Sequence, residues 1–242
     1  MYYDLHIHSC LSPCAEAEMT PNNICNMAML KGLDLIAVSD HNSCRQQPGM
    51  KAASEKTGIR LLYGAELQSM EEVHLLALFR SLEDCRNLQT WIDEVMPQIP
   101  NDPDYFGSQE ILNGMDEQIG IEKRLLLVSL NAALEECIDA IHACSGIAVP
   151  AHVMGRENSI MNQLGFIPEE LDYDALELRN EKEKEEVLNL HPWMREKDTI
   201  WLIDSDAHRL IDISEREHQM SEETLERLWR NGDDAGAGNA DS

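Results

Sequence analysis

Histidines that could bind metal ions stand on or directly after short apolar runs of the chain. Six of the nine histidines do so and two acidic residues accompany them: His6, His8, His41, His74, His152 and His208, with Glu66 and Asp206. One buried histidine is ordinarily a core residue with a satisfied hydrogen bond. A core with eight such titratable groups would be costly unless ions satisfied them. Imidazole and carboxylate donors suit Zn²⁺, Mn²⁺ or Fe²⁺, and eight exceed what one ion needs, so the pattern predicts a cluster of divalent ions.

Two pairs of these donors are each separated by a single residue. His6 and His8 end the first apolar run, and Asp206 and His208 follow the last one. In an extended chain, residues i and i+2 point to the same side. Each pair can therefore present two donors to one ion.

Seven apolar runs that could position these donors predict strands, and helical patterns lie between most of them. The predicted strands are Tyr2–His6, Asp34–Ser39, Arg60–Glu66, Val73–Phe79, Ile147–His152, Ala175–Leu178 and Ile200–Asp204. Several runs are almost continuously apolar, as in strands that are buried on both faces of a parallel sheet. The alternation predicts an α/β fold with a mainly parallel sheet that closes into a barrel. In such barrels the chemistry lies at the carboxyl ends of the strands.

The organisation of the chain predicts one domain over residues 1–230. A helix should begin at Thr20-Pro21 and another should cover Pro48–Thr57. Residues 82–146 form a long, mostly helical connection between the fourth and fifth strands, and the charged run 181–186 is interpreted as a solvated helix face. Residues 231–242 are small, polar and acidic, which predicts a flexible tail.

The net charge limits the partners that we expect. Lys and Arg number 19 and Asp and Glu number 45, so the net charge is −26. Nucleic acids and anionic membranes require a positive footprint. We therefore expect neither long nucleic acid nor a membrane as partner, whereas a small phosphorylated substrate is compatible because divalent ions supply positive charge locally. Nothing in the sequence indicates an oligomeric state.

The remaining composition indicates a reducing cytoplasm. No apolar run approaches the roughly 18 residues that a membrane span needs. The segment MYYDLHIHS lacks the basic and apolar regions of a secretory signal. The seven cysteines are an odd number without the spacing of a disulfide framework, so most of them should be small buried residues.

Four short motifs together resemble those of a known family. H-x-H-S begins at His6, S-D-H-N contains His41, G-x-E ends at Glu66, and D-x-H joins Asp206 to His208. In this order they resemble the PHP family, the polymerase and histidinol phosphatase-type metal-dependent phosphoesterases, over roughly residues 2–210. The family fold is a distorted, TIM-like (β/α)7 barrel, which agrees with the seven strands predicted above.

The resemblance implies a site for three ions and assigns its donors. The first ion would be held by His6, His8, Glu66 and Asp206; the second by Glu66, His74 and His152; and the third by His41 and His208. The chain departs from the family pattern at Cys14, where some members have His, and at Pro13, where others have Asp. Either Cys14 is a thiolate ligand, which would favour a softer ion such as Zn²⁺, or the third ion is weak or absent. Cys14 could also be a packed loop thiol.

The resemblance also implies a mechanism. Clustered divalent ions lower the pKa of bound water and stabilise the oxygens of an in-line displacement at phosphorus. We place Asp206, His208 and Arg156 among the catalytic residues. Arg156 and Arg45 are candidates to bind the substrate phosphate through a guanidinium, or each could pair with an acidic neighbour. Asp40 is expected to orient a ligand imidazole.

These observations predict a metal-dependent phosphoesterase that hydrolyses a small phosphate monoester or a nucleotide-type phosphoester. Glu177 and Asn180, at the end of the sixth predicted strand, are candidates to line its pocket. One alternative is an exonuclease on short oligonucleotides. A long-strand version is disfavoured because the chain has no basic stripe and only 5% aromatic residues. The other alternative is a metal-binding or regulatory PHP module without catalysis.

Overall fold

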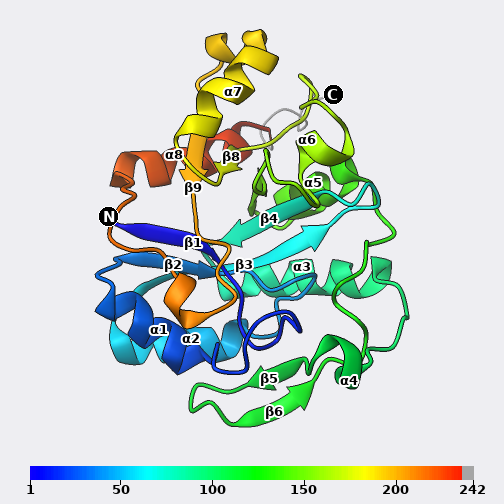
Figure 1. Ribbon diagram of the computed structural model, residues 1–242, viewed down its shortest axis with the longest axis vertical. Coiled ribbons are helices and arrows are strands. Elements are labelled where there is room, and N and C mark those ends of the chain that lie inside the picture. Colours follow the sequence, from blue (N-terminus) through cyan, green and yellow to red (C-terminus); the bar gives the residue numbers. More distant parts are fainter. Residues whose placement is uncertain (236–242) are drawn as a thin grey trace, which may run out of the picture.

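A curled sheet of five strands forms the centre of the fold (Figure 1). The computed structural model describes residues 1–235. The five strands lie in the order β1-β2-β3-β4-β7: β1 Tyr3–Ile7, β2 Leu35–Val38, β3 Arg60–Gln68, β4 His74–Phe79 and β7 Ile147–Pro150. A separate parallel pair consists of β8 Ala175–Leu178 and β9 Ile200–Ile203. All seven strands predicted from the sequence are therefore present.

The direction of β4 corrects the expected sheet. β4 runs antiparallel to both of its neighbours, β3 and β7, whereas β1, β2 and β3 are parallel. Only residues 69–73 join β3 to β4. So short a connection allows an antiparallel pair but not a parallel one, which needs a crossover of about a dozen residues. As a result, the first residue of β4, His74, lies at the edge of the sheet where β3 ends.

Isolated hydrogen bonds bridge the two gaps between the five-stranded sheet and the β8–β9 pair. On one side, the amide of His8 donates to the carbonyl of Ala207 at 2.9 Å. On the other side, the amide of Asp174 donates to Ala148 at 3.0 Å and that of Val153 to Glu177 at 2.9 Å. These contacts curl the seven strands around one interior without a continuous ladder. The fold is thus a mixed α/β half-barrel with an adjacent strand pair, rather than the full (β/α)7 barrel that was expected.

Helices surround the curled sheet (Figure 1). They are α1 Pro21–Leu30, α2 Gln47–Thr57, α3 Leu82–Val95, α5 Leu134–Ala143, α6 Ile160–Gln163, α7 Lys182–Leu190 and α8 Glu222–Ala235, with 3-10 turns at Pro192–Glu196 and Leu210–Asp212. Both expected helix boundaries are confirmed. The Thr20 side chain accepts from the amide of Asn23 at the start of α1, and Gly58 ends α2 with a φ of 78°.

The connection between β4 and β7 contains a hairpin that the sequence analysis missed. After α3 come the short helix α4 Pro103–Phe106 and the antiparallel strands β5 Glu110–Leu112 and β6 Gln118–Ile121. The hairpin lies at the far end of the molecule from α7 (Figure 1). Asn113-Gly114 in its turn is a recognised hairpin signal that could have revealed it.

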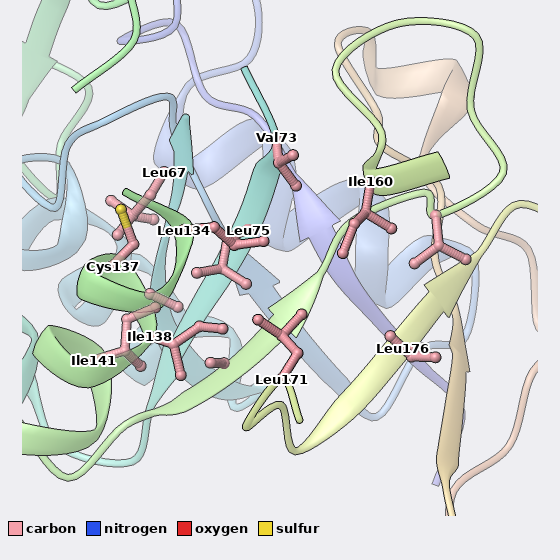
Figure 2. Close-up of a cluster of buried hydrophobic side chains, with 14 of the residues drawn as sticks. Leu67, Val73, Leu75, Leu134, Cys137, Ile138, Ile141, Ile160, Leu171 and Leu176 are labelled. Atoms are coloured by element: carbon pink, nitrogen blue, oxygen red, sulfur yellow. The ribbon is translucent and has the colours of Figure 1, made fainter. Parts of the chain in front are cut away.

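The core lies on both faces of the sheet. Figure 2 shows the outer part, where Leu67 and Leu75 of the sheet pack near Leu134, Ile138 and Ile141 of α5. Inside the curl, alternate residues of the same strands point the other way, as the two-residue period of a strand requires. This inner cluster includes Leu5, Leu76, Leu78, Val149 and Leu202, and Leu225 and Leu228 of α8 pack against it.

Two further expectations concern the cysteines and the ends of the chain. All seven cysteines are free, and five of them are buried. Of the tail expected from residue 231, residues 231–235 belong to α8 and residues 236–242 lie outside the described part. In the described part, every helix is too short or too polar to cross a bilayer.

Candidate metal centre

The carboxylate of Glu66 stands at the centre of the histidine cluster. Five imidazoles approach its two oxygens: His41 Nδ1 and His74 Nδ1 both at 2.8 Å, His6 Nε2 at 3.2 Å, His152 Nε2 at 3.4 Å and His8 Nε2 at 3.5 Å. Glu66 is 1% exposed. A buried carboxylate with five imidazoles around it is a donor set rather than an ordinary ion pair.

The fold brings these rings and Glu66 together from five segments of the chain. His6 lies in β1 and His8 directly follows it; His41 follows β2, Glu66 lies near the end of β3, and His152 follows β7. His74 opens β4 and reaches the same edge because β4 runs antiparallel. The expected i, i+2 geometry holds for the first pair, whose Nε2 atoms lie 3.2 Å apart.

Asp206 and His208 complete the cluster from the segment after β9. The Asp206 Oδ1 atom lies 3.1 Å from His8 Nε2 and 3.3 Å from His6 Nε2. The ring of His208 stacks on that of His8 with centroids 4.2 Å apart. Asp206 has a φ of 50° and His152 a φ of 32°. Backbone strain of this kind concentrates at functional sites. There it can direct a side chain toward the site when an unstrained backbone would point it elsewhere.

The donors fit divalent ions. Three groups have ligand atoms that lie within 4.8 Å of one another: His8, His41 and His208; His6, His8 and Asp206; and His41, Glu66 and His74. Within the described residues, both Glu66 oxygens, His74 Nε2 and His152 Nδ1 are buried without a hydrogen-bond partner. Unpaired buried polar atoms are costly, and a bound cation would satisfy the carboxylate oxygens.

The charges in the cluster favour ionised carboxylates. Burial alone would raise the pKa of Glu66, but the rings of His74, His6 and His41 outweigh burial and hold that pKa well below its usual value. Burial likewise opposes ionisation of Asp206, yet His6 and His8 lower its pKa overall. Burial and the neighbouring His41 hold the pKa of His8 well below the usual value, so that ring stays neutral. Burial opposes the charge of His6, but Glu177, Asp206 and Glu66 outweigh burial and raise the pKa of that ring. Because metals bind neutral imidazoles, an ion at His6 would displace a proton.

Hydrogen bonds outside the cluster fix which nitrogen of two rings faces inward. His6 Nδ1 lies 2.9 Å from the carboxylate of Glu177 and donates to it, so Nε2 is the nitrogen that faces the cluster. Asp40 acts on His8 through a relay: the Ser12 hydroxyl donates to Asp40 at 2.8 Å and accepts from His8 Nδ1 at 3.0 Å. Such outer partners orient ligand imidazoles, which is the role expected for Asp40.

Cys14 lies at the exposed side of the cluster. It is an exposed residue of the loop that follows β1. Burial would raise the pKa of this thiol, but the bonds to His208 and His41 outweigh it and lower the pKa to about 7. Cys14 is therefore near the metal donors and is not packed in the core.

The cluster opens into a cavity of about 470 Å³. Arg156 lies on its wall, is exposed and has no ion pair among the described residues. Glu177 also lines it, as expected. Arg179 is a lining residue that the sequence analysis missed, although its place directly after β8 was a usable signal.

Two candidate residues are not part of this cavity. Arg45 pairs with Glu122 at 3.0 Å and with Asp93 at 2.8 Å, so its guanidinium already has acidic partners. Arg45 is therefore not placed to bind a phosphate in this cavity. Asn180 lines a separate depression on the surface and not the metal cavity.

Comparison with known proteins decides the family. A family model of the PHP domain matches residues 4–143, more than half of the chain. The chain belongs to the PHP domain family. The expectation of a metal-dependent phosphoric ester hydrolase is thereby confirmed at the level of the family. A curated relative, the uncharacterized protein MJ0043 of Methanocaldococcus jannaschii, is 24% identical over 163 residues, which are 67% of this chain and 18% of that protein. This PHP chain thus spans less than a fifth of that relative.

Solved structures share the PHP fold at low identity. A candidate metal-dependent phosphoesterase from Bifidobacterium adolescentis has a TM-score of 0.68 at 17% identity, with 95% of this chain and 96% of that chain covered. The lesion-specific endonuclease Q of Pyrococcus furiosus has a TM-score of 0.61 at 20% identity, with 98% of this chain and 56% of that chain covered.

The exclusion of long nucleic acid as a partner is wrong. Endonuclease Q in complex with a 27-mer duplex has a TM-score of 0.59 to this PHP chain at 19% identity, over 98% of this chain and 57% of that chain, and an abasic lesion occupies its active site. A protein that contains this fold therefore binds duplex DNA. The prediction rested on the net charge of −26. A charge summed over the whole chain does not describe the local electrostatic potential at a site that could hold cations.

Proposed function

We propose that this PHP chain hydrolyses a small phosphate monoester or a nucleotide-type phosphoester at a centre of two or three divalent ions. The observation that carries the proposal is the set of five imidazoles around Glu66, which opens into a cavity lined by Arg156. A cavity of about 470 Å³ lies within the range of sites for small ligands. The donors would be His6, His8, His41, Glu66, His74, His152, Asp206 and His208.

The ions would be Zn²⁺, Mn²⁺ or Fe²⁺, which mixed imidazole and carboxylate donors suit. When bound, such ions supply a nucleophile from water at neutral pH and stabilise charge on phosphoryl oxygens. The protein prepares the site by holding Glu66 and Asp206 ionised and by aiming Nε2 of His6 and of His8 at the cluster.

Arg156 would bind the substrate phosphate. It lies on the cavity wall in the loop after His152, and its guanidinium can donate two parallel hydrogen bonds to phosphate oxygens. His208 is half-exposed at the same cavity, and its Nδ1 donates to the Asp206 carbonyl at 2.8 Å. This bond leaves His208 Nε2 free to bind an ion or accept a proton, the catalytic role expected for it.

The test combines metal analysis with a substrate panel. The purified protein is loaded with Mn²⁺ or Zn²⁺ and assayed on an aryl phosphate, mononucleotides and small phosphate monoesters. We expect bound metal and hydrolysis, with both lost in His6→Ala and Asp206→Asn. A metal-replete protein that is inactive on the whole panel would overturn the proposal. In that case a lower melting temperature of the same variants would support the alternative of a metal-binding module without catalysis.

An exonuclease on short oligonucleotides is the second candidate. It is favoured by the likeness of the fold to endonuclease Q over 98% of this chain. Rates on mononucleotides, dinucleotides, trinucleotides and a duplex of about 27 base pairs separate the candidates. Faster turnover of the oligonucleotides than of the mononucleotides would replace the first proposal with the second.

A further inference from the structure

A β-bulge interrupts the hairpin of β5 and β6. Ile111 of β5 pairs with Gly120 of β6. The next residue of β5, Leu112, pairs with Gln118, so β6 contains one extra residue, Ile119. A bulge breaks the two-residue alternation of a strand and re-aims a side chain. Ile119 and Ile111 accordingly line the same cavity, although the two residues are not paired.

This cavity lies between the hairpin and the helices α2 and α3, and its volume is about 330 Å³. Small organic ligands occupy sites of this size. The cavity shares no lining residue with the metal cavity, so it is a separate site. We call it the hairpin cavity; its lining includes the apolar residues Pro48, Cys44, Ile111 and Ile119, with Arg45 and Arg86.

Two guanidinium groups at the hairpin cavity have unused donors. Arg45 donates from Nε to Glu122 at 3.0 Å and from Nη2 to Asp93 at 2.8 Å, whereas its Nη1 has no partner in the described part of the chain. Arg86 is exposed, and the carboxylate of Glu83 lies 3.8 Å from it, too far for a hydrogen bond. The chain has 45 acidic residues for 19 basic ones. Two cations with unused donors beside an apolar wall therefore indicate a place for an external anion.

We propose that the hairpin cavity binds a small organic anion with an apolar body, such as a medium-chain carboxylate. The head group accepts hydrogen bonds from Arg86 and from Nη1 of Arg45, which suits the planar donor fork of arginine. The apolar body packs on Ile111, Ile119 and Pro48, where its burial adds to the free energy of binding. The proposal is independent of the phosphoesterase activity, because none of these residues belongs to the metal centre.

Binding of the anionic dye anilinonaphthalene sulfonate tests the proposal, because the dye fluoresces in apolar surroundings. We expect saturable binding to the wild-type protein, and octanoate should compete with the dye whereas inorganic phosphate should not. Arg86→Gln and Ile119→Ser should each weaken binding by ~10-fold or more, the effect of losing one charged hydrogen bond or one aliphatic contact surface. Both side chains are exposed, so neither substitution should disturb the fold.

A variant that fills the hairpin cavity gives a second test. A Cβ atom at Gly120 would lie 3.5 Å from Cδ1 of Ile111, which is an ordinary contact distance. Gly120→Val should therefore fold, occupy the space beside Ile111 and abolish competition by octanoate while both arginines remain. Octanoate that still displaces the dye from Gly120→Val would contradict the proposal.

Two matched controls come from the same hairpin. Lys123→Gln removes an exposed cation and Ile121→Ser an exposed apolar side chain, and neither residue lines the hairpin cavity. Both variants should bind the dye with wild-type affinity. Equal affinities in Arg86→Gln and the wild type would overturn the proposal, since the dye would then recognise apolar surface alone. Displacement of the dye by inorganic phosphate would overturn it as well, since the site would then recognise charge alone.

Discussion

Glu177 holds His6 in the orientation that a metal ligand needs. One carboxylate oxygen lies 2.9 Å from His6 Nδ1, and the other accepts from the main-chain amide of His152 at 2.6 Å. A single buried side chain thus links β8 to ligand-bearing segments at β1 and β7. The site depends on this contact as well as on the ligands themselves.

Removal of this contact should weaken metal binding. We expect Glu177→Ala to lower the affinity for divalent ions by ~10–100-fold because His6 loses the partner that fixes its tautomer. Isothermal titration with Zn²⁺ or Mn²⁺ measures the effect. Glu181→Gln is the control, since Glu181 is exposed. Equal affinities in Glu177→Ala and the wild type would show that His6 needs no outer partner.

The two arginines proposed from the sequence should differ in effect. Arg156→Ala should raise KM for a phosphoester by ~10–100-fold without loss of bound metal. This is the change in affinity expected when one or two charged hydrogen bonds are lost. Arg45→Ala should leave KM unchanged and lower stability, because Arg45 pairs with Asp93 and Glu122. Steady-state kinetics and urea unfolding of both variants decide the matter. A larger KM effect in Arg45→Ala would reverse our assignment.

Local patterns predicted the members of the cluster because each pattern combines a strand end with a possible donor. The i, i+2 pairs at His6 and at Asp206 lie at strand ends by sequence alone, and the strands converge because the sheet curls. The direction of β4 was also accessible from the five-residue link before His74. The antiparallel direction of β4 was missed because the prediction assumed alternating strands and helices throughout. No helix separates β3 from β4.

The remaining contacts of the predicted residues join positions that are far apart in sequence. Glu177 meets His6 across 171 residues, and Arg45 meets Glu122 across 77 residues. No local pattern specifies such partners. Glu183 is a further case: the charged run 181–186 was interpreted as a solvated face, yet this residue is 4% exposed. Its inward position follows from α7, where it lies one turn before buried Val187.

Buried Glu183 should matter for substrate binding through Arg179. Its carboxylate accepts from the Arg179 amide at 2.9 Å and from Nε at 2.8 Å, and the same guanidinium donates to the carbonyl of Met154 at 3.1 Å. Met154 belongs to the loop that carries Arg156. Arg179 is therefore a positioning residue for that loop, and Arg179→Ala should raise KM severalfold with little change in kcat.

A double-mutant cycle separates positioning from general destabilisation. If Arg179 acts through Arg156, Arg179→Ala should change KM little in an Arg156→Ala background. Glu183→Gln should show the same dependence. Effects of Arg179→Ala that simply add to those of Arg156→Ala would mean that Arg179 acts on substrate or stability by another route.

Protonation of Glu122 should lower the stability of the protein at acid pH. Burial opposes ionisation, but hydrogen bonds from Arg124 and the charge of Arg45 outweigh it and lower the pKa of Glu122 from 4.5 to about 2. A carboxyl group with a depressed pKa in the folded state stabilises the protein above its unfolded pKa. Its contribution is therefore complete above pH 4.5 and is lost as the pH falls toward 2.

Glu122→Gln should expose this contribution in urea unfolding at several pH values. At neutral pH the variant should be less stable by about 1–3 kcal/mol, since Arg124 and Arg45 lose a charged partner. The difference should shrink as the pH falls from 4.5 toward 2, because the carboxyl group is protonated first in the unfolded chain and then, near pH 2, in the folded protein as well. Glu135→Gln, at an exposed position of α5, controls for the loss of one negative charge. A difference that stays constant down to acid pH would show that Glu122 stabilises by packing and not by charge.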